Sequence, residues 1–275
     1  MNETKKEQLR VIAQKIRLGA LECVYSANSG HPGGSLSIAD ILAYLYFEKM
    51  NVDPAKPDDD NRDRFVLSKG HTAPALYTAL ALKGFFSTEL LKTFRKEGSI
   101  LQGHPDMKNV PGVDVSTGSL GLGISMACGI ALSGKVSEKS YRTYTILGDG
   151  ELEEGQVWEA AMFASHYKLD NLLAFVDFNG LQIDGKVTDV MNPTPIDEKF
   201  KAFGWNVYVI DGHSFDEIEK AVNDAETVKG KPSVIICKTT KGKGVSFMED
   251  RAEWHGSAPN KEQYETAVAE IQATI

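Results

Sequence analysis

The chain has 275 residues, and its 30 Lys and Arg against 38 Asp and Glu give a formal net charge of −8. This is the composition of an ordinary globular protein, long enough for one large α/β domain or two small ones. No run of about 18 apolar residues is present to span a bilayer. An acidic chain without a dense Lys/Arg stripe is a poor nucleic-acid binder, so we expect neither a membrane nor a nucleic acid as partner.

The cysteines and the N-terminal residues bear on the compartment. Cys23, Cys128 and Cys237 are odd in number and far apart, which argues against a disulfide framework or a zinc ribbon. The N-terminus reads MNETKKEQLR and lacks the charged start, apolar middle and small-residue cleavage site of a signal peptide. We therefore expect a cytoplasmic protein.

In the first half of the chain, predicted helices are separated by segments rich in glycine and proline. The segment NSGHPGG ends the first helix, and Ser35 or Ser37 is expected to cap the second. A long loop at 98–118 is of the kind that often carries function in a compact domain. The apolar pattern predicts helices at 5–27, 38–46, 73–83 and 125–132, a solvated connection at 53–64 and a strand at 65–67.

In the second half, short apolar runs alternate with helical patterns. We expect strands at 143–147, 172–176, 207–210 and 234–237, and helices at 154–167, 215–227 and 260–275. This alternation predicts a parallel sheet covered by helices on both faces. Because no repeat, low-complexity segment or convincing boundary interrupts the chain, we expect one α/β domain over residues 1–275.

Two polar segments follow successive predicted strands. Asp149 lies between two glycines after the strand at 143–147, and Asn179 follows the next strand. Neighbouring parallel strands would bring both side chains to one edge of the sheet, where ligands bind in open α/β folds. A carboxylate, an amide oxygen and a backbone carbonyl suit octahedral Mg²⁺ beside a diphosphate. Asp-Gly and Asn-Gly are also common turn dipeptides, but the spacing and the strand-to-helix context favour the magnesium diphosphate site.

The same segment carries a family resemblance. GDG followed about thirty residues later by Asn is the signature of thiamine diphosphate enzymes, and residues 144–185 resemble transketolases closely. One departure is Phe178, where many thiamine enzymes carry the first Asn of an Asn-Asn pair. The resemblance continues, in the family's order, in SGHPGGSLSIADIL, DRFVLSKGHTAPALY, QGHPD and STGSLGLGISMACGIAL. It implies a thiamine diphosphate-binding fold of the diphosphate type.

The resemblance also implies site residues. As metal ligands it implies Asp149, Asn179 and the main-chain oxygen of Leu181, holding Mg²⁺, with Ca²⁺ or Mn²⁺ as substitutes. As contacts to thiamine diphosphate it implies His71, Gly118, Ser119, Leu120, Gly150, Glu154, Asn179 and His255. As catalytic residues it implies His31, His71, His104 and His255.

Histidine suits the ketol transfer that the resemblance implies. The reaction removes a hydroxyl proton as a C–C bond is cleaved and later returns it, and imidazole titrates near neutrality, so it moves protons in both directions. The alternative for any histidine is a structural hydrogen bond or a surface position. We assign His166 and His213 to that class, because neither lies in a matched motif.

Two further pairs of charged residues are ambiguous. By resemblance, Glu154 and Glu159 approach a subunit interface and couple two active sites. The alternative is two solvated helix acids, because positions i and i+5 do not share a face well. Lys241 and Lys243 lie in TTKGKG, which lacks the GxxxxGK[ST] pattern of a phosphate loop, so we do not expect a nucleoside triphosphate site.

The length of the chain predicts a partner. Full-length transketolases carry a pyrimidine-binding domain and a C-terminal domain after a domain like this one. The chain is thus a fragment or, as its MNETKK start and its end soon after His255 favour, the N-terminal subunit of a split transketolase. The expected partner is the C-terminal subunit, in an α2β2 heterotetramer that transfers a two-carbon ketol unit between sugar phosphates, as in the pentose phosphate pathway.

Two alternative functions stay open. The first alternative is a subunit of another thiamine diphosphate enzyme, either deoxyxylulose phosphate synthase-like or 2-oxo acid decarboxylating. Such a subunit would share the GDG motif and Asn179. The SGHPGGS, KGH and GHPD motifs argue against both. The second alternative is a non-catalytic thiamine-binding relative, which the intact Asp149 and loop histidines disfavour.

Overall fold

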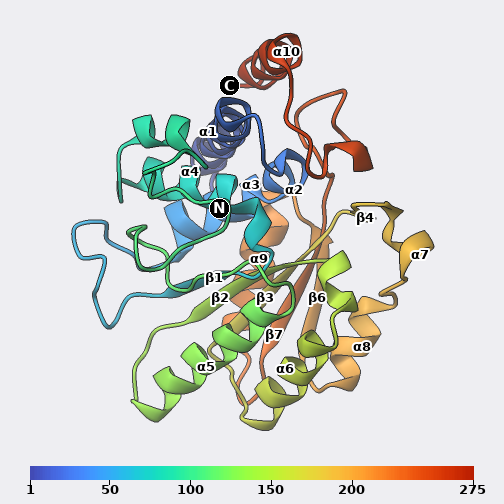
Figure 1. The fold of residues 1–275 in the computed structure, drawn as a ribbon. Helices are drawn as coiled ribbons and strands as arrows, with labels where there is room; N and C mark the ends of the chain where they lie inside the picture. Colours follow the sequence, from blue (N-terminus) through green and yellow to red (C-terminus); the bar gives the residue numbers. More distant parts are fainter.

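The computed structural model describes residues 1–275 (Figure 1). The helices are α1 (Glu3–Ala27), α2 (Pro32–Ser37), α3 (Ala39–Tyr44), α4 (Ala73–Lys83), α5 (Leu122–Val136), α6 (Gly155–His166), α7 (Val187–Val190), α8 (Ile196–Ala202), α9 (Phe215–Thr227) and α10 (Lys261–Gln272). The strands are β1 (Arg64–Leu67), β2 (Thr143–Gly148), β3 (Leu172–Phe178), β4 (Leu181–Gln182), β5 (Gly185–Lys186), β6 (Asn206–Asp211) and β7 (Ser233–Lys238). None of the helices has the length and apolar character needed to cross a bilayer.

Five of the strands form one parallel sheet in the order β1-β2-β3-β7-β6, and β4 and β5 form a separate antiparallel pair. Successive side chains of a strand point to opposite faces. In β3, Leu173 and Phe175 therefore join the core on one face, whereas Leu172, Ala174 and Val176 join the core on the other. Both faces are buried, as the strand–helix alternation predicts.

The helices form a layer on each face of the sheet (Figure 1). The larger core cluster, of 39 buried residues, joins one face to α1, α3, α4 and α9. The smaller cluster, of 20 residues, joins the other face to α5, α6 and α8. The predicted α/β class with helices on both faces is thus confirmed.

The boundaries of most predicted helices agree with the structure. The helix expected at 215–227 is α9, and Ser214 caps it by accepting a hydrogen bond from the backbone N–H of Glu217. Helix α5 is longer than the predicted 125–132 at both ends, since it begins directly after Gly121 and continues to Val136. The loop expected at 98–118 is confirmed, since no α-helix or strand occurs between α4 and α5.

The second helix differs from the prediction. It is divided into α2 and α3 at Ile38, and neither Ser35 nor Ser37 caps it, because both are buried within α2. Pro32 begins α2 at the first helical position, where its missing N–H costs nothing. The sequence predicts that these glycines break the helix, but Gly33 is helical, and a Cβ there would lie 2.8 Å from the Trp254 carbonyl oxygen. Close packing therefore explains this glycine.

Candidate active site

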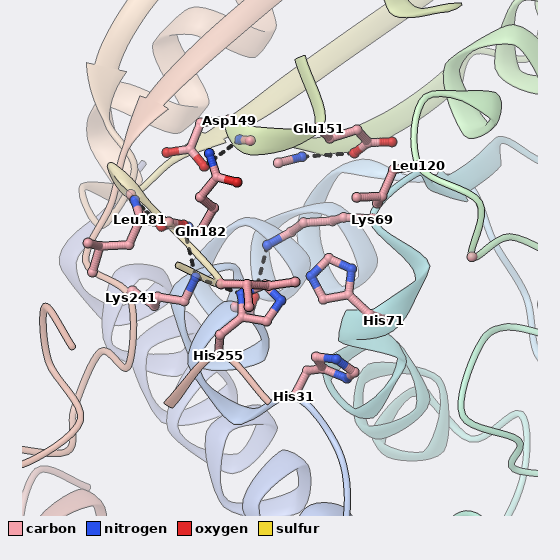
Figure 2. A pocket seen from close by; sticks show the side chains of 16 residues that line it. His31, Lys69, His71, Leu120, Asp149, Glu151, Leu181, Gln182, Lys241 and His255 are labelled. Atoms are coloured by element: carbon pink, nitrogen blue, oxygen red, sulfur yellow. Dashed lines mark hydrogen bonds between the residues drawn. The ribbon is translucent and has the colours of Figure 1, made fainter. Parts of the chain in front are cut away.

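A cavity of about 270 Å³ lies beyond the carboxyl ends of the central strands, where ligands bind in open α/β sheets. Acidic side chains lie on one side of it and three histidines on the other (Figure 2). Nine of its 16 lining residues are among those predicted, namely His31, His71, Gly118, Leu120, Asp149, Gly150, Asn179, Leu181 and His255. Segments from across the whole chain therefore converge on one site.

Asp149 and Asn179 lie beside each other, as the two-strand argument predicts. Gly148 of β2 pairs with Asp177 of β3, so the residues that follow both strands meet at one edge. The Asp149 carboxylate accepts hydrogen bonds from the backbone N–H of Gly150 at 2.8 Å and of Gly180 at 2.5 Å. Burial and the nearby Asp177 carboxylate raise the pKa of Asp149 to about 7. This edge thus concentrates negative charge that a cation would stabilise.

Asp177, which the sequence reasoning missed, orients Asn179. Its fully buried carboxylate accepts hydrogen bonds from Ser37 Oγ at 2.7 Å, Lys69 Nζ at 2.5 Å, Asn179 Nδ2 at 2.9 Å and Thr239 Oγ1. The Lys69 ammonium holds the pKa of this carboxyl below its usual range despite burial. Because a carboxylate only accepts hydrogen bonds, it fixes the amide nitrogen of Asn179 toward itself. The amide oxygen then points away from Asp177.

Glu151 is a second buried acid that the sequence reasoning missed. Its carboxylate accepts hydrogen bonds from Ser68 Oγ at 2.5 Å and from the backbone N–H of Gly121 at 2.9 Å and Gly148 at 3.0 Å. Burial raises the pKa of Glu151. These contacts join the GDG turn to the loop that precedes α5, so Glu151 fixes the shape of the cavity wall.

The three histidines form a cluster. The ring centroid of His31 lies 5.0 Å from that of His71 and 5.4 Å from that of His255, and the His71 and His255 centroids are 5.2 Å apart. Burial lowers the pKa of His31 to about 4, that of His255 to about 3, and that of His71 well below its ordinary value. All three are neutral at pH 7, so each ring has one nitrogen that accepts a proton or hydrogen bond, and in His255 that nitrogen, Nδ1, faces the Lys241 ammonium.

Lys241 is a further missed residue, and it lines the cavity. Its Nζ donates a hydrogen bond of 2.9 Å to the Leu181 carbonyl oxygen and lies 3.0 Å from Nδ1 of His255 (Figure 2). Burial and the positive charge of Lys69 lower the pKa of Lys241 to about 8. The TTKGKG sequence carries no local signal for this contact, which joins Lys241 to Leu181 across 60 positions.

His213 has the structural role that was predicted for it. Its Nδ1 lies 2.6 Å from the Asp40 carboxylate, which also pairs with Arg17 at 2.5 Å. Its Nε2 accepts a 2.9 Å hydrogen bond from the backbone N–H of Thr240. His213 therefore fixes the backbone directly before Lys241. His166 is exposed at the end of α6, also as predicted.

Three predicted residues do not line the cavity. His104 is exposed beside Gly118, where a Cβ would lie 2.9 Å from His104 Cδ2, and partial burial and Arg95 lower the pKa of His104. Ser119 and Glu154 are exposed outside the lining set. Glu159 is likewise exposed, on α6.

The residues present suit a metal ion and a diphosphate. No cluster of three His, Cys, Asp or Glu side chains is placed to hold a metal, so a cation would depend on the Asp149 carboxylate with neutral oxygens of Asn179 and Leu181. Such hard oxygen ligands match Mg²⁺, which takes further ligands from phosphate. The buried Nδ1 of His31 has no hydrogen-bond partner. His31 lines the cavity, and an unpartnered buried polar atom in a lining residue is typical of a functional site.

Comparison with known proteins identifies the family. Residues 8–272 match the family model described as transketolase, thiamine diphosphate binding domain. The chain is 49% identical over 94% of its length to the 6-deoxy-6-sulfo-D-fructose transketolase subunit SqwG of Clostridium sp. (strain MSTE9), covering 94% of that protein. It is 45% identical over 98% of its length to one subunit of the apulose-4-phosphate transketolase of Phocaeicola vulgatus, covering 95% of that protein.

A solved structure gives the same result. The crystal structure of transketolase from Campylobacter jejuni superposes with a TM-score of 0.92 at 36% identity, over 99% of this chain. The match covers only 43% of that transketolase, so the chain spans less than half the length of the enzyme it resembles. The chain belongs to the transketolase family and corresponds to its thiamine diphosphate-binding domain.

Proposed function

We propose that the chain is the N-terminal subunit of a two-component transketolase, acting as one domain that holds the diphosphate and metal of the cofactor. The coverage of its relatives carries this proposal. The chain spans 94% and 95% of two bacterial proteins named as transketolase subunits, but 43% of a full-length transketolase. A C-terminal subunit would then supply the rest of the active site, in an α2β2 heterotetramer in the cytoplasm.

In this proposal the edge beyond β2 and β3 binds the metal and the diphosphate. Asp149, Asn179 and the Leu181 carbonyl oxygen hold Mg²⁺, for which Ca²⁺ or Mn²⁺ substitute. The Leu181 oxygen already accepts from Lys241, and a carbonyl has two lone pairs, so the two interactions are compatible. His71, His255, Lys241 and Gly150 face the diphosphate, and Gly118, Ser119, Leu120 and Glu154 contact the remainder of the cofactor.

The histidines provide the proton transfers of the proposed reaction. When bound, thiamine diphosphate supplies the electron sink for cleavage of a C–C bond, and the protein supplies orientation and polarity. His31, His104 and His255 have lowered pKa values and are neutral at pH 7. A neutral ring accepts a hydroxyl proton from the donor sugar and returns it when the acceptor aldehyde is bound. We propose His31 and His104 as the contacts to sugar hydroxyls.

The experiment is reconstitution with a partner from the same organism that aligns with the part of transketolase beyond this chain. With thiamine diphosphate and Mg²⁺, we expect ketol transfer across a panel of ketose and aldose phosphates. The panel is needed because the two bacterial relatives carry the names of different sugars. Consumption of pyruvate in place of ketol transfer would support a 2-oxo acid decarboxylating or deoxyxylulose phosphate synthase-like function.

A variant of the proposed metal site distinguishes a catalytic subunit from a non-catalytic thiamine-binding relative. We expect Asp149→Ala to abolish Mg²⁺-dependent binding of thiamine diphosphate, measured by calorimetry on the reconstituted complex, and to abolish turnover. Asp189→Ala is the matched control, because Asp189 is an exposed acid in α7, outside the cavity lining. Unchanged activity of Asp149→Ala would favour a non-catalytic relative.

A further inference from the structure

Arg95 has an unusual backbone conformation. It lies in the long connection between α4 and α5, and its φ of 59° places it in the left-handed region. Residues other than glycine rarely adopt this conformation, and such strain persists only where the surrounding contacts fix it. Here the backbone N–H of Arg95 donates a hydrogen bond of 2.8 Å to the Leu101 carbonyl oxygen. The closed turn fixes the backbone from which the guanidinium extends.

The Arg95 guanidinium carries a positive charge without a counter-ion. The buried Arg17 pairs with Asp40 at 2.5 Å, whereas no Asp or Glu side chain pairs with Arg95. Burial lowers the pKa of Arg95, and its buried Nε has no hydrogen-bond partner. A buried polar atom without a partner calls for an explanation. Since no ion pair explains where this side chain lies, its contacts with other segments of the chain must do so.

Two contacts of the guanidinium reach the segments that carry His31 and His104. Nη1 donates a hydrogen bond of 2.6 Å to Oγ of Ser29, which lies two residues before His31. The guanidinium also lies against Gly103, directly before His104, because a Cβ on Gly103 would lie 2.8 Å from Nε and 3.1 Å from Nη2. Glycine thus leaves the room that this close approach needs. Arg95 therefore forms a bridge between the two histidine segments.

Core residues anchor both ends of this bridge. Phe94 is fully buried, and a Cβ on Gly30 would lie 3.3 Å from its Cε1. Cζ of Arg95 lies 5.3 Å from the centroid of the same ring, within the range of a cation–π contact. The buried Tyr77 of α4 donates a hydrogen bond of 2.8 Å from its hydroxyl to the His104 carbonyl oxygen. Both histidine segments are thus attached to the core, with Arg95 between them.

The charge of Arg95 acts on the same two histidines. After burial, Arg95 is the largest cause that lowers the pKa of His31, to about 4, and the pKa of His104. For His71 and His255 the largest charge effects come instead from lysines. This difference agrees with the contacts, which place Arg95 beside the segments of His31 and His104.

We infer that Arg95 is a positioning residue for ketol transfer, which fixes His31 and His104 relative to each other. It acts through Ser29 and Gly103, and neither these residues nor Arg95 itself lines the cavity. The inference rests on the proposed function, in which the two histidines contact sugar hydroxyls. Because a misplacement of about 1 Å costs about 100-fold in rate, a bridge that fixes both segments affects turnover directly.

Three substitutions test the bridge. Arg95→Lys keeps the positive charge but lacks the planar fork that contacts both segments. Ser29→Ala removes the hydrogen-bond acceptor, and Gly103→Ala places a Cβ 2.8 Å from Nε. The matched control is Arg10→Lys, because Arg10 is exposed on α1, where it pairs with Glu7. Circular dichroism melts of each variant show that the chain folds.

The first measurement uses the isolated chain and records NMR signals of the histidine rings. We expect Arg95→Lys to shift the signals of both His31 and His104. Ser29→Ala should shift His104, on the far side of the bridge, and Gly103→Ala should shift His31. The signal of His166, exposed on α6, and all ring signals of the Arg10→Lys control should stay in place. Unchanged His31 and His104 signals in folded Arg95→Lys overturn the inference.

The second measurement uses the complex reconstituted with the C-terminal subunit, thiamine diphosphate and Mg²⁺. We expect Arg95→Lys to lower kcat/KM at least tenfold, with the Kd for thiamine diphosphate within about twofold of wild type, because Arg95 does not line the cavity. Ser29→Ala in the Arg95→Lys background should lower kcat/KM by no more than about a further twofold, since the two changes remove the same contact.

The outcomes separate the inference from the proposed function. Wild-type kcat/KM in Arg95→Lys overturns the inference, because the positive charge alone would then suffice. A loss of kcat/KM matched by an equal rise in the thiamine diphosphate Kd also overturns it, because the cavity as a whole would then be damaged. If the wild-type complex shows no ketol transfer, the proposed function fails and the role in ketol transfer with it. The NMR signals of the isolated chain then still decide whether Arg95 fixes the two histidines.

Discussion

Asn179 donates a hydrogen bond of 2.9 Å from Nδ2 to Oδ2 of the buried Asp177. The two residues are separated by one position at the end of β3, and only Asn179 lines the cavity. The carboxylate therefore sets which end of the Asn179 amide faces the cavity. Orientation of a proposed metal ligand by a second, buried group is typical of metal sites in proteins.

The first prediction concerns the buried pair of Asp177 and Lys69. Asp177→Ala leaves the Lys69 ammonium without its carboxylate, with both side chains at most 3% exposed in the wild type. Removal of one partner of a buried pair costs about 3–5 kcal/mol. We expect a loss of this size in the free energy of unfolding, measured by urea denaturation. Asp197→Ala, which removes a surface pair with Lys201, should change it by less than about 1 kcal/mol. Equal losses in the two variants would contradict the prediction.

The second prediction concerns Lys241 and His255. The Lys241 charge is among the causes that lower the pKa values of His255 and His31. Lys241→Met removes that charge and the donor to His255 Nδ1, so both pKa values should rise toward their ordinary range. Titration of the histidine ring protons by NMR measures this. Lys243→Met is the control, because Lys243 pairs with Glu249 at the surface, and it should leave both pKa values in place. A His255 pKa that stays near 3 in Lys241→Met would disprove the coupling.

The third prediction is a pH dependence of stability. His71 has a pKa well below its ordinary value in the folded chain, so below about pH 6.5 the unfolded chain binds the proton that the folded chain excludes. Stability from this group is complete above pH 6.5 and falls as the pH decreases. Asp149 acts in the opposite direction, because its pKa of about 7 makes the folded chain bind a proton first.

Variants separate the two groups. In the metal-free chain between about pH 5 and pH 6.5, we expect His71→Asn to reduce the slope of unfolding free energy against pH by up to about 1.4 kcal/mol per pH unit. Asp149→Asn should make that slope more positive over the same interval. Urea denaturation at half-unit pH steps provides the measurement, and parallel curves for the wild type and His71→Asn would contradict it.

The fourth prediction distinguishes two histidines outside the cavity. His213→Phe leaves the Thr240 N–H without an acceptor and removes a hydrogen bond to Asp40. An unsatisfied buried polar group costs about 1–3 kcal/mol. His213→Gln retains an acceptor near the Nε2 position and should lose less stability. His166→Phe changes an exposed side chain and should stay within about 0.5 kcal/mol of wild type. The midpoint of thermal unfolding should decrease in the order His166→Phe, His213→Gln, His213→Phe. The reverse order would contradict the His213 contacts.

The sequence predicts the fold because its signals are local. Apolar runs followed by glycine mark the carboxyl ends of β2 and β3, and the helical spacing of α9 places its boundaries. The sequence also predicts that Asp149 lies close to the Asn179 segment, because neighbouring parallel strands end at the same edge of the sheet. By contrast, the α2 prediction was wrong because the conformational freedom of glycine says nothing about Trp254, which packs on Gly33 from more than 200 residues away.

The missed residues of the candidate site lack a local signal. Lys69 and Asp177 lie 108 positions apart, and each in isolation resembles an ordinary surface residue in the sequence. Lys241 contacts Leu181 across 60 positions. Their burial is decided by tertiary packing, so pattern reasoning on one sequence does not find them. A charged residue within the last two positions of a buried strand, as at Asp177 in β3, is the one signal available.

The central claim is that this chain holds the diphosphate and metal but needs a second subunit to catalyse ketol transfer. The most direct measurement is the steady-state rate of ketol transfer by the purified chain alone, by its C-terminal partner alone and by the mixture, each with saturating thiamine diphosphate and Mg²⁺. We predict turnover only in the mixture, rising with added partner to a plateau at equal numbers of the two chains. Turnover by this chain alone would contradict the claim.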